Sequence, residues 1–536
     1  MTKIVDCTLR DGGYYCDWVF DKTLVKRYLV AMSSAGVDIV EVGFRFSTKP
    51  KFLGPYAYTS DDYLRSLALP EGPRYAVMVN AKDYLDSSAP VASQIRKSFD
   101  KQANSPVDIV RIAANREELP VARQVASALV ELGYTVCLNV MQITNIPSDE
   151  LQVMTKAIAG WDVVEVLYFA DSFGNLTPSD TRRIIEILQT EWRGELGIHA
   201  HNNKERALVN TLSAMQVGVE YLDSTILGMG RGAGNASTEG LLVELNASGH
   251  DEYYPDAVFP LVLHEFSDLK KRYGWGPNLY YFLSATHGIH PTYIQEMLGE
   301  TYGTDQILDG IKSLRLSGAN LFSLDAMSRA ISGSGGTAKG RWSAKNWCKD
   351  KNVLIVGTGS TVDAHIEQIV TFAKKHDAMV LCLNINDAIP IDTVTAFVAC
   401  YETRILVQAA KYSSLGKPLI IPMARVPDDI GKMLQSVEVM DYGMLVQDES
   451  FEPTEFGCTI PASYAGAYAI ALAVAAGSSN IYVAGFDGYS QEDPRQKTMT
   501  AVVDLYDKLA GAPSLISLTP TSYPIKTISV YAPSLY

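Results

Sequence analysis

The feature that most constrains this chain is a regular alternation of short apolar runs and amphipathic stretches over residues 3–250. Most of the runs are rich in Val and Ile, which is typical of parallel strands buried on both faces. Helix-like segments such as Asp21–Ala35, Leu119–Leu132 and Ser179–Glu191 separate them. The eight runs are Lys3–Cys7, Asp38–Val42, Tyr75–Val79, Asp108–Ile112, Thr135–Val140, Asp162–Tyr168, Gly197–His201 and Tyr221–Ile226.

Eight strand–helix units in about 250 residues predict a (β/α)8 TIM barrel, with an open doubly wound sheet as the alternative. Polar residues at the ends of the runs favour the barrel, because barrel active sites are built at the carboxyl ends of the strands. These residues are Arg10, Asp11, Glu41, Asn139, Asp171, His199 and His201.

Three of these polar residues predict a metal site. His199 and His201 are two residues apart on one strand, so their side chains point to the same face. Asp11 follows the first strand, and two histidines with one carboxylate form an open divalent site. Such a mixed oxygen and nitrogen set suits Mn²⁺ or Mg²⁺, with Zn²⁺ as a further choice. The alternative is a chance histidine pair on a half-buried strand.

Length and charge limit what the whole chain can do. A chain of 536 residues is too long for one core, and we expect divisions at 1–255, 256–335 and 345–536. The net charge of −14 argues against a nucleic-acid surface. No apolar run reaches the length of a membrane span, and residues 1–6 lack a signal-peptide pattern. Seven scattered cysteines indicate free thiols, so we expect a cytoplasmic enzyme. We also expect a homo-oligomer.

The last two hundred residues restart the strand pattern after a Ser/Gly-rich linker at 332–337. Strand Asn352–Val356, a glycine turn and helix Val362–Lys375 resemble the entry to a Rossmann-like nucleotide-binding unit. Gly357, Gly359 and Ser360 are therefore candidate nucleotide-binding residues, and a tight turn that binds nothing is the alternative. Further strands are expected at Met379–Ile385, Arg404–Gln408, Pro418–Ile421 and Ile481–Ala484.

Four motifs together resemble one superfamily over residues 1–250. They are Asp-Cys-Thr-Leu-Arg-Asp-Gly at 6–12, Ala-Asp-Ser-Phe-Gly at 170–174, Gly-Ile-His-Ala-His-Asn-Asn at 197–203 and Gly-Met-Gly-Arg-Gly-Ala-Gly-Asn-Ala at 228–236. This pattern is similar to that of the metal-dependent pyruvate aldolases and HMG-CoA lyase-like barrels, and it most resembles 4-hydroxy-2-oxovalerate aldolase. Other members of the superfamily are isopropylmalate synthase and homocitrate synthase.

The resemblance assigns roles to particular residues. It implies a divalent metal on Asp11, His199 and His201, with Asn235 as a ligand or neighbour, although asparagine is also common in turns. It places Arg10 against an enolate oxygen or a substrate carboxylate.

The general base is where the sequence departs from the aldolases. Those enzymes carry a histidine where this chain has Tyr14, so Tyr14 and His290, in a helical segment expected to complete the site, are the candidates. For either residue, the alternative is a role in packing alone. Asp171, Asn139 and Glu41 are expected to position substrate, or else to form the polar rim of the barrel.

The predicted function is a retro-aldol reaction, or its reverse, between pyruvate or a related 2-keto acid and an aldehyde. An acyl-CoA Claisen synthase or lyase is the alternative, but condensing synthases usually read Arg-Asp-Gly-Glu-Gln where this chain reads Arg-Asp-Gly-Gly-Tyr. A binding protein with a silent barrel is a third reading, disfavoured because every expected ligand is present.

A second resemblance concerns the end of the chain. Residues 461–468 and 480–489 resemble bacterial sialyltransferase-like domains, which would imply a nucleotide sugar as ligand and a sugar aldehyde as barrel substrate. Those transferases use a late histidine as base, and this chain has no histidine after His376. A glycosyltransferase in this region is the fourth hypothesis, and the missing histidine weighs against it.

Overall fold

The computed structural model describes most of the chain. The described residues are 1–47, 52–85, 89–299, 302, 304–320, 322–324, 326–327, 330, 335–490 and 493–532. The chain divides into two compact units, Met1–Gln295 and Glu296–Tyr536.

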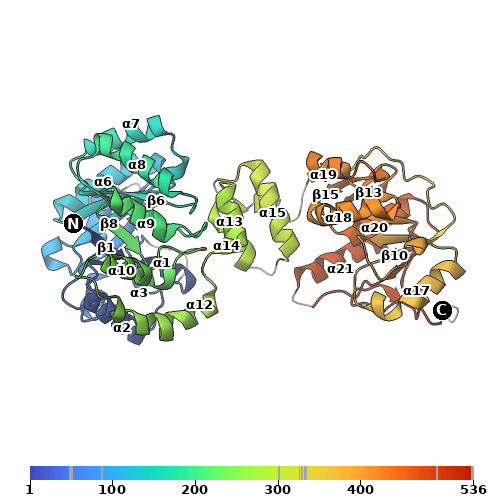
Figure 1. Cartoon of the computed structure of the whole chain (residues 1–536), viewed down its shortest axis with the longest axis horizontal. Helices are drawn as coiled ribbons and strands as arrows, with labels where there is room; N and C mark the ends of the chain where they lie inside the picture. The colour runs from blue at the N-terminus through green and yellow to red at the C-terminus, as the bar shows by residue number, and fades with distance from the viewer. Residues whose placement is uncertain are drawn as a thin grey trace. The chain divides into compact units, whose positions relative to one another are not determined.

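The first unit is a closed barrel of eight parallel strands (Figure 1, blue to green). The barrel closes where β1 pairs with β8, in a register that sets Lys3 against Tyr221. The strands are β1 (Lys3–Asp6), β2 (Ile39–Phe44), β3 (Arg74–Asn80), β4 (Ile109–Ala114), β5 (Thr135–Val140), β6 (Val166–Asp171), β7 (Glu195–Ala200) and β8 (Tyr221–Ser224). The predicted (β/α)8 barrel is confirmed.

One strand boundary differs clearly from the sequence prediction. The sixth strand was expected from Asp162, but β6 begins at Val166. Asp162 has a φ of +54°, in the left-handed region, so the chain is still turning after the preceding helix. The apolar residues Val163 and Val164 pack against the core from this turn rather than from a strand.

Helices cover the outside of the barrel because their apolar stripes have the 3.6-residue period. In α6, for example, Val121, Val125 and Leu129 are buried. The helices that follow the strands of this unit are α1 (Thr8–Asp11), α2 (Lys22–Ser34), α3 (Pro55–Tyr58), α4 (Asp61–Arg65), α5 (Val91–Ser98), α6 (Leu119–Glu131), α7 (Ser148–Ala159), α8 (Pro178–Glu191), α9 (Ala207–Gln216) and α10 (Thr238–Ala247).

A helical segment follows the barrel, as the sequence predicted. The expected helix Leu261–Tyr273 is present, but it is interrupted by a π-helical turn at Val262–Phe266. The helices here are α11 (Phe259–Leu261), α12 (Ser267–Tyr273), α13 (Leu279–Thr286), α14 (Pro291–Gly299) and α15 (Thr304–Ser317).

The second unit contains an eight-stranded parallel sheet in the order β14-β13-β12-β11-β10-β18-β19-β20. From β10 the chain builds outward through β14, and it later returns to add β18 beside β10. These strands are β10 (Asn352–Val356), β11 (Met379–Leu383), β12 (Ala396–Val398), β13 (Leu419–Ile421), β14 (Val439–Asp441), β18 (Asn480–Ala484), β19 (Ser514–Ser517) and β20 (Lys526–Thr527).

Helices pack on both faces of this sheet, so alternate residues of β10 belong to different cores. Val353 and Ile355 pack with α20 on one face, whereas Leu354 and Val356 pack with α17 and α18 on the other. The helices are α17 (Thr361–Lys375), α18 (Glu402–Leu415), α19 (Asp428–Met433), α20 (Ala465–Ala475) and α21 (Pro494–Asp507).

Two sequence predictions fail in this unit. The expected strand Arg404–Gln408 is part of α18, where Ile405, Ala409 and Tyr412 form a buried helical stripe. A short apolar run cannot distinguish a strand from a buried helix.

The second failure concerns the expected linker at 332–337. Its last residues, Gly335–Thr337, form β9, which pairs antiparallel with β15 (Gly443–Val446). Residues 332–334 lie outside the described residues. The small sheet also contains β16 (Glu452–Thr454) and β17 (Gly457–Ile460). Across both units, no described helix combines the length and apolarity that crossing a bilayer requires.

Candidate active site

The first loop of the barrel is shaped by two glycines that have no room for a side chain. Asp11 ends the one-turn helix α1, directly after β1. A Cβ added to Gly13 would lie 2.1 Å from Cδ1 of Trp18, and one added to Gly12 would lie 2.7 Å from Sδ of Met229. The indole N–H of Trp18 donates to the carbonyl of Arg10 over 2.9 Å. The Gly-Gly pair therefore lets Trp18 and Met229 pack closely against the loop that carries Arg10 and Asp11.

Asp11, His199 and His201 meet at the carboxyl end of the barrel. Each contributes one possible ligand atom, and the three atoms lie within 4.8 Å of one another. The Nε2 atoms of the two histidines are 3.2 Å apart, and Nε2 of His199 is 3.7 Å from Oδ2 of Asp11. Asp11 is 2% exposed and His199 7%, whereas His201 is half-buried, so the site is shielded on one side and reachable at His201.

His199 is held in this orientation by a residue that the sequence analysis missed. Its Nδ1 lies 2.9 Å from Oδ2 of Asp223, on the neighbouring strand β8. A carboxylate on one ring nitrogen fixes the tautomer and leaves the other nitrogen with a lone pair for a ligand. Asp223 therefore aims Nε2 of His199 at Asp11 and His201.

A closed ring of buried ionic contacts continues from Asp223 across the barrel. Arg111 bonds Asp223 over 2.5 Å and Glu41 over 3.0 Å, and Arg10 bonds Glu41 over 2.7 Å and Asp11 over 2.9 Å. Arg111 on β4 thus reaches across the barrel to Asp223 on β8 and past β3 to Glu41 on β2. Three carboxylates face two guanidiniums in this ring, which leaves it with one net negative charge.

The donor set fits a divalent cation. Asn235 donates its amide N–H to Oδ2 of Asp11, and its Oδ1 is buried with no hydrogen-bond partner among the described residues. Burial, followed by the charge of His199, lowers the pKa of His201 to about 3, so its imidazole is neutral. Burial opposes ionisation of Asp11, but the Arg10 guanidinium, the two histidines and the hydrogen bond from Asn235 together outweigh it and lower the pKa of Asp11 below its ordinary value. An ionised carboxylate, a neutral imidazole and an unpartnered amide oxygen are ligand forms that suit such a metal.

A third arginine, Arg231, joins the two candidate proton-transfer residues. Its guanidinium lies over the ring of Tyr14, 5.2 Å from the centroid, and hydrogen-bonds the hydroxyl of Thr292. Thr292 in turn donates its backbone N–H to Nδ1 of His290 over 3.3 Å. Tyr14 and His290 are thereby linked through Arg231 at the mouth of the barrel.

The protonation states of these two residues differ from expectation. Burial raises the pKa of Tyr14, although Arg231 acts in the opposite direction, so a lowered tyrosine pKa is not found. Burial, aided by Arg231, lowers the pKa of His290 to about 4. Tyr14 thus keeps its proton at neutral pH, while His290 is neutral.

Comparison with known proteins adds independent findings. The HMGL-like family model matches residues 83–268, which include β4 to β8 and both histidines. Over these residues the barrel is similar to the HMGL-like family.

Two curated relatives and one solved structure illustrate the likeness. An oxaloacetate decarboxylase from Mycobacterium tuberculosis is 28% identical over 249 residues, which cover 46% of this chain and 70% of the relative. A 4-hydroxy-2-oxovalerate aldolase from Carboxydothermus hydrogenoformans is 28% identical over 251 residues, or 46% of this chain and 72% of the relative. The N-terminal domain of a candidate aldolase from Bacteroides vulgatus superposes with a TM-score of 0.51 and 29% identity, covering 57% of this chain and 99% of that domain. The predicted resemblance of the barrel and the predicted enzyme class, a lyase, are confirmed. The resemblance of residues 461–468 and 480–489 to sialyltransferase-like domains stays a prediction.

The three predicted substrate-positioning residues lie in different settings within the barrel. Glu41 is fully buried beneath Arg10 and is engaged by both arginines of the ring. Asp171 accepts backbone N–H groups from Asn175 and Leu176, so it shapes the loop after β6. Asn139 is 3% exposed and its Oδ1 has no partner within the described part of the chain. Asn139 Oδ1 and Glu41 Oε1 therefore both lack a partner among the described residues, whereas both carboxylate oxygens of Asp171 accept backbone N–H groups.

Asp223, Arg111 and Arg231 were not among the predicted site residues. A signal was available for two of them, because Arg111 and Asp223 are charged residues inside apolar runs that read as buried strands. Buried charges are rare unless they are paired, so two of opposite sign in one barrel indicate an ion pair. Arg231 lies in the glycine-rich loop 228–236, and nothing in its spacing distinguishes it from a surface arginine.

The candidate nucleotide residues of the second unit surround a carboxylate of the protein itself. Asp487 accepts the backbone N–H of Thr361 over 3.1 Å and the hydroxyls of Ser360 and Thr361. A Cβ on Gly359 would lie 2.5 Å from Cγ of Asp487, and one on Gly357 would lie 2.6 Å from the carbonyl oxygen of Gly485. The glycines therefore accommodate the packing of the β18 loop, and Asp487 caps the helix end where a phosphate was expected.

Proposed function

We propose that the barrel is a divalent-metal-dependent aldolase that forms or cleaves a 4-hydroxy-2-keto acid. The reactants would be pyruvate, or a related 2-keto acid, and an aldehyde. The observation that carries this proposal is the convergence of Asp11, His199 and His201 beside the buried Arg10. The names of the relatives support it, since both an aldolase and a decarboxylase release or form a small keto acid.

Asp11, His199 and His201 would hold the metal, with Asn235 as a further oxygen ligand or an orienting neighbour. Mn²⁺ or Mg²⁺ suits this set, and Zn²⁺ is also compatible with it. When bound, a divalent ion supplies Lewis-acid stabilisation of negative charge on the keto oxygen of the substrate.

Arg10 would supply a second positive charge at the same place. Its Nε and Nη1 are fixed by Glu41 and Asp11, so the guanidinium plane is set before substrate arrives. Preorganised donors of this kind stabilise the charge that develops as a carbon–carbon bond breaks, because little reorganisation is required. Arg231, at the rim and beside Tyr14, is placed to pair with the carboxylate of a keto acid.

Proton transfer would involve Tyr14 and His290. In the cleavage direction, a base removes the proton of the 4-hydroxyl group, and an acid then returns a proton to the enolate carbon. Neutral His290 can act as the base, and protonated Tyr14, whose pKa is raised, can act as the acid.

Decarboxylation of a 2-keto diacid is a second candidate reaction, favoured by the relative from M. tuberculosis. It would use the same groups, because loss of CO₂ from oxaloacetate also leaves the enolate of pyruvate. No proton needs to leave a hydroxyl group in that case, so the base is dispensable. The two reactions can therefore be separated by their dependence on His290.

The test combines metal content with pyruvate release. Purified protein is assayed for bound metal, then for pyruvate formation from a panel of 4-hydroxy-2-keto acids and from oxaloacetate. His199→Ala should lose both metal and turnover while keeping its circular dichroism spectrum. His264→Ala, which changes an exposed histidine outside the site, is the matched control and should behave as the wild type. Full activity of a metal-free wild type would refute the proposal.

A further inference from the structure

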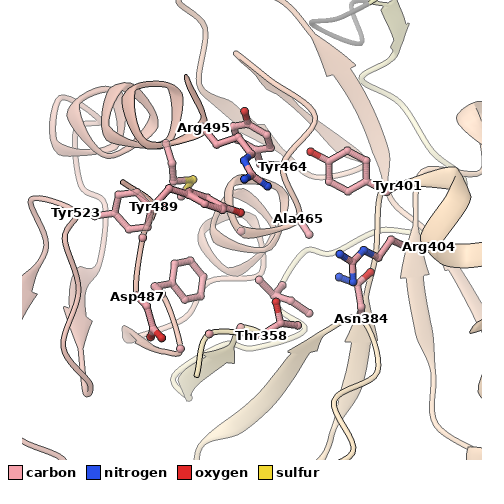
Figure 2. A pocket seen from close by; sticks show the side chains of 18 of the residues that line it. Thr358, Asn384, Tyr401, Arg404, Tyr464, Ala465, Asp487, Tyr489, Arg495 and Tyr523 are labelled. Carbon is pink, nitrogen blue, oxygen red and sulfur yellow. The ribbon is translucent and has the colours of Figure 1, made fainter. Parts of the chain in front are cut away.

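The second unit contains a cavity of about 630 Å³ that the barrel chemistry does not explain (Figure 2). It lies at the carboxyl ends of β10, β11 and β18. The loops that follow these strands contribute Thr358, Asn384 and Asp487 to its lining. A volume of this size accommodates a small organic molecule.

The position of the cavity in the sheet is itself informative. β10 is the first strand of the sheet, β11 lies on one side of it and β18 on the other. The connection after β10 therefore leads to one side, whereas the strand on the other side is added later in the chain. In open parallel sheets, the crevice at such a reversal of strand order is the usual place for a ligand.

Two helix N-termini without a side-chain cap reach the cavity. Although Asp487 closes the N-terminus of α17, α20 begins at Ala465 with no side-chain cap, and both Ala465 and Gly466 line the cavity. The N-terminus of α18 also has no side-chain cap, and its Tyr401 and Arg404 are lining residues. Uncapped N–H groups at the positive end of a helix favour an anion.

Two arginines line the cavity around these helix ends. In Figure 2, Ala465 is drawn between the guanidinium groups of Arg404 and Arg495. Arg495 is oriented by Asp493 over 2.6 Å and lies 4.0 Å from the ring centroid of Tyr489. Arginine combined with helix N-termini is a common arrangement for phosphate recognition.

Aromatic side chains form much of the remaining wall. Tyr401, Tyr464, Tyr489 and Tyr523 are drawn around the same space in Figure 2. Tyrosine rings offer flat faces for a sugar or a base, together with hydroxyl groups for polar contacts. A simple inorganic anion would leave this part of the cavity unfilled.

Asn384 gives an independent indication of a ligand. Its side chain is 8% exposed, it lines the cavity, and its Oδ1 has no hydrogen-bond partner among the described residues. Its backbone is in the left-handed region, with a φ of +57°. A buried amide oxygen without a partner and a left-handed backbone at one residue are features typical of ligand sites.

We infer that this cavity binds a phosphate ester carried by a sugar or nucleoside ring. The phosphate lies at the start of α20 between Arg404 and Arg495, the ring packs against the tyrosines, and Asn384 bonds a polar group of the ring. The glycine turn 357–359 forms one wall, but the N-terminus of α17 is not the phosphate site because Asp487 occupies it.

Calorimetry on the full chain tests this inference. The probes are inorganic phosphate, glucose 6-phosphate, UMP, UDP-glucose, and uncharged glucose and uridine. We expect at least one ring phosphate to bind more tightly than inorganic phosphate, and the uncharged compounds to bind at least tenfold more weakly. Binding of UMP and UDP-glucose alone would identify a nucleotide, and binding of glucose 6-phosphate as well would identify the shared sugar phosphate.

Variants show whether the binding occurs in this cavity. Arg404→Gln and Arg495→Gln should each weaken binding by about tenfold or more, as expected for a lost charged hydrogen bond. Lys411→Gln removes an exposed charge from the same helix as Arg404 and should leave binding unchanged. Asn384→Ala provides a further test that keeps all charges, and it should weaken binding of the ring phosphate but not of inorganic phosphate.

Two results would overturn the inference. One is the failure of every phosphorylated probe to bind the wild type. The other is binding that none of the Arg404, Arg495 and Asn384 variants weakens. Thermal melts of each variant are recorded alongside, so that a loss of binding is scored only for folded protein. Metal content of the barrel should be unchanged throughout, which separates this test from that of the proposed aldolase.

Discussion

The two units of this protein use the same local arrangement, a carboxylate beside a glycine, for different ends. In the barrel, a Cβ on Gly230 would lie 2.8 Å from Oδ2 of Asp11. In the second unit, a Cβ on Gly359 would lie 2.6 Å from Oδ1 of Asp487. Both glycines make room for an aspartate at the carboxyl end of a parallel sheet.

The partners of each aspartate explain the difference. Asp11 meets an arginine, an asparagine amide and two histidine nitrogens, and one side of it remains available for a cation. Asp487 accepts a backbone N–H and two hydroxyls at the start of a helix, which satisfies it within the protein. A glycine motif therefore shows that something approaches the backbone closely, but the approaching group can be a ligand or the protein itself.

The strongest test of this contrast is Asp11→Asn. The change keeps the shape of the side chain but removes the charge that a divalent ion requires. Since Lewis-acid stabilisation is worth several kcal/mol, turnover should fall by about 10³-fold or more. Metal analysis and pyruvate release measure the effect. Retention of both metal and activity would mean that Asp11, like Asp487, serves only the fold.

Proton transfer at the barrel mouth is tested by Tyr14→Phe and His290→Asn. Loss of a general acid or base reduces kcat by about 10²–10⁴-fold, and metal content should not change. Because the pKa of His290 is lowered to about 4, the wild-type rate should hold as the pH falls and decline only near that value. His290→Asn should abolish this acidic decline. Two near-normal variants would assign the proton transfer to another group.

Asp223→Asn tests whether the ring of ionic contacts supports the metal ligands. The amide cannot hold His199 in the same tautomer as a carboxylate, so metal affinity or activity should fall by about 10–100-fold. The readout is the Kd for Mn²⁺, compared with that of Glu195→Gln, which changes a partly exposed carboxylate on β7. If the two variants bind metal equally well, Asp223 is only a charge partner of Arg111.

The smallest effect is expected from Asp487→Ala. Removing a helix N-cap costs about 1 kcal/mol of stability, so the second unit should melt at a lower temperature. Pyruvate release by the barrel should be unchanged. Differential scanning calorimetry of the full chain measures the first effect and the pyruvate assay the second. A loss of pyruvate release would instead connect this cap to the barrel reaction.

Sequence reasoning recovered the barrel because its signals are local. Val- and Ile-rich runs mark strands, and the spacing of His199 and His201 places both side chains on one face. The missed features depend on distant pairings. Asp487 caps a helix that begins 126 residues earlier, and Arg111 meets Asp223 across 112 residues. The error at Arg404–Gln408 has another cause, because a run of five residues is too short to show a helical period.

The ring formed by Asp11, Arg10, Glu41, Arg111, Asp223 and His199 has a consequence for how such barrels can diverge. Removing one member of a buried ion pair is strongly destabilising, by about 3–5 kcal/mol, whereas replacing both members together can be nearly neutral. Single substitutions at Glu41, Arg111 or Asp223 should therefore be eliminated by selection. Among related barrels, these three positions should change together. The strands β2, β4, β7 and β8, which carry these residues and the ligand His199, should therefore be inherited as a unit.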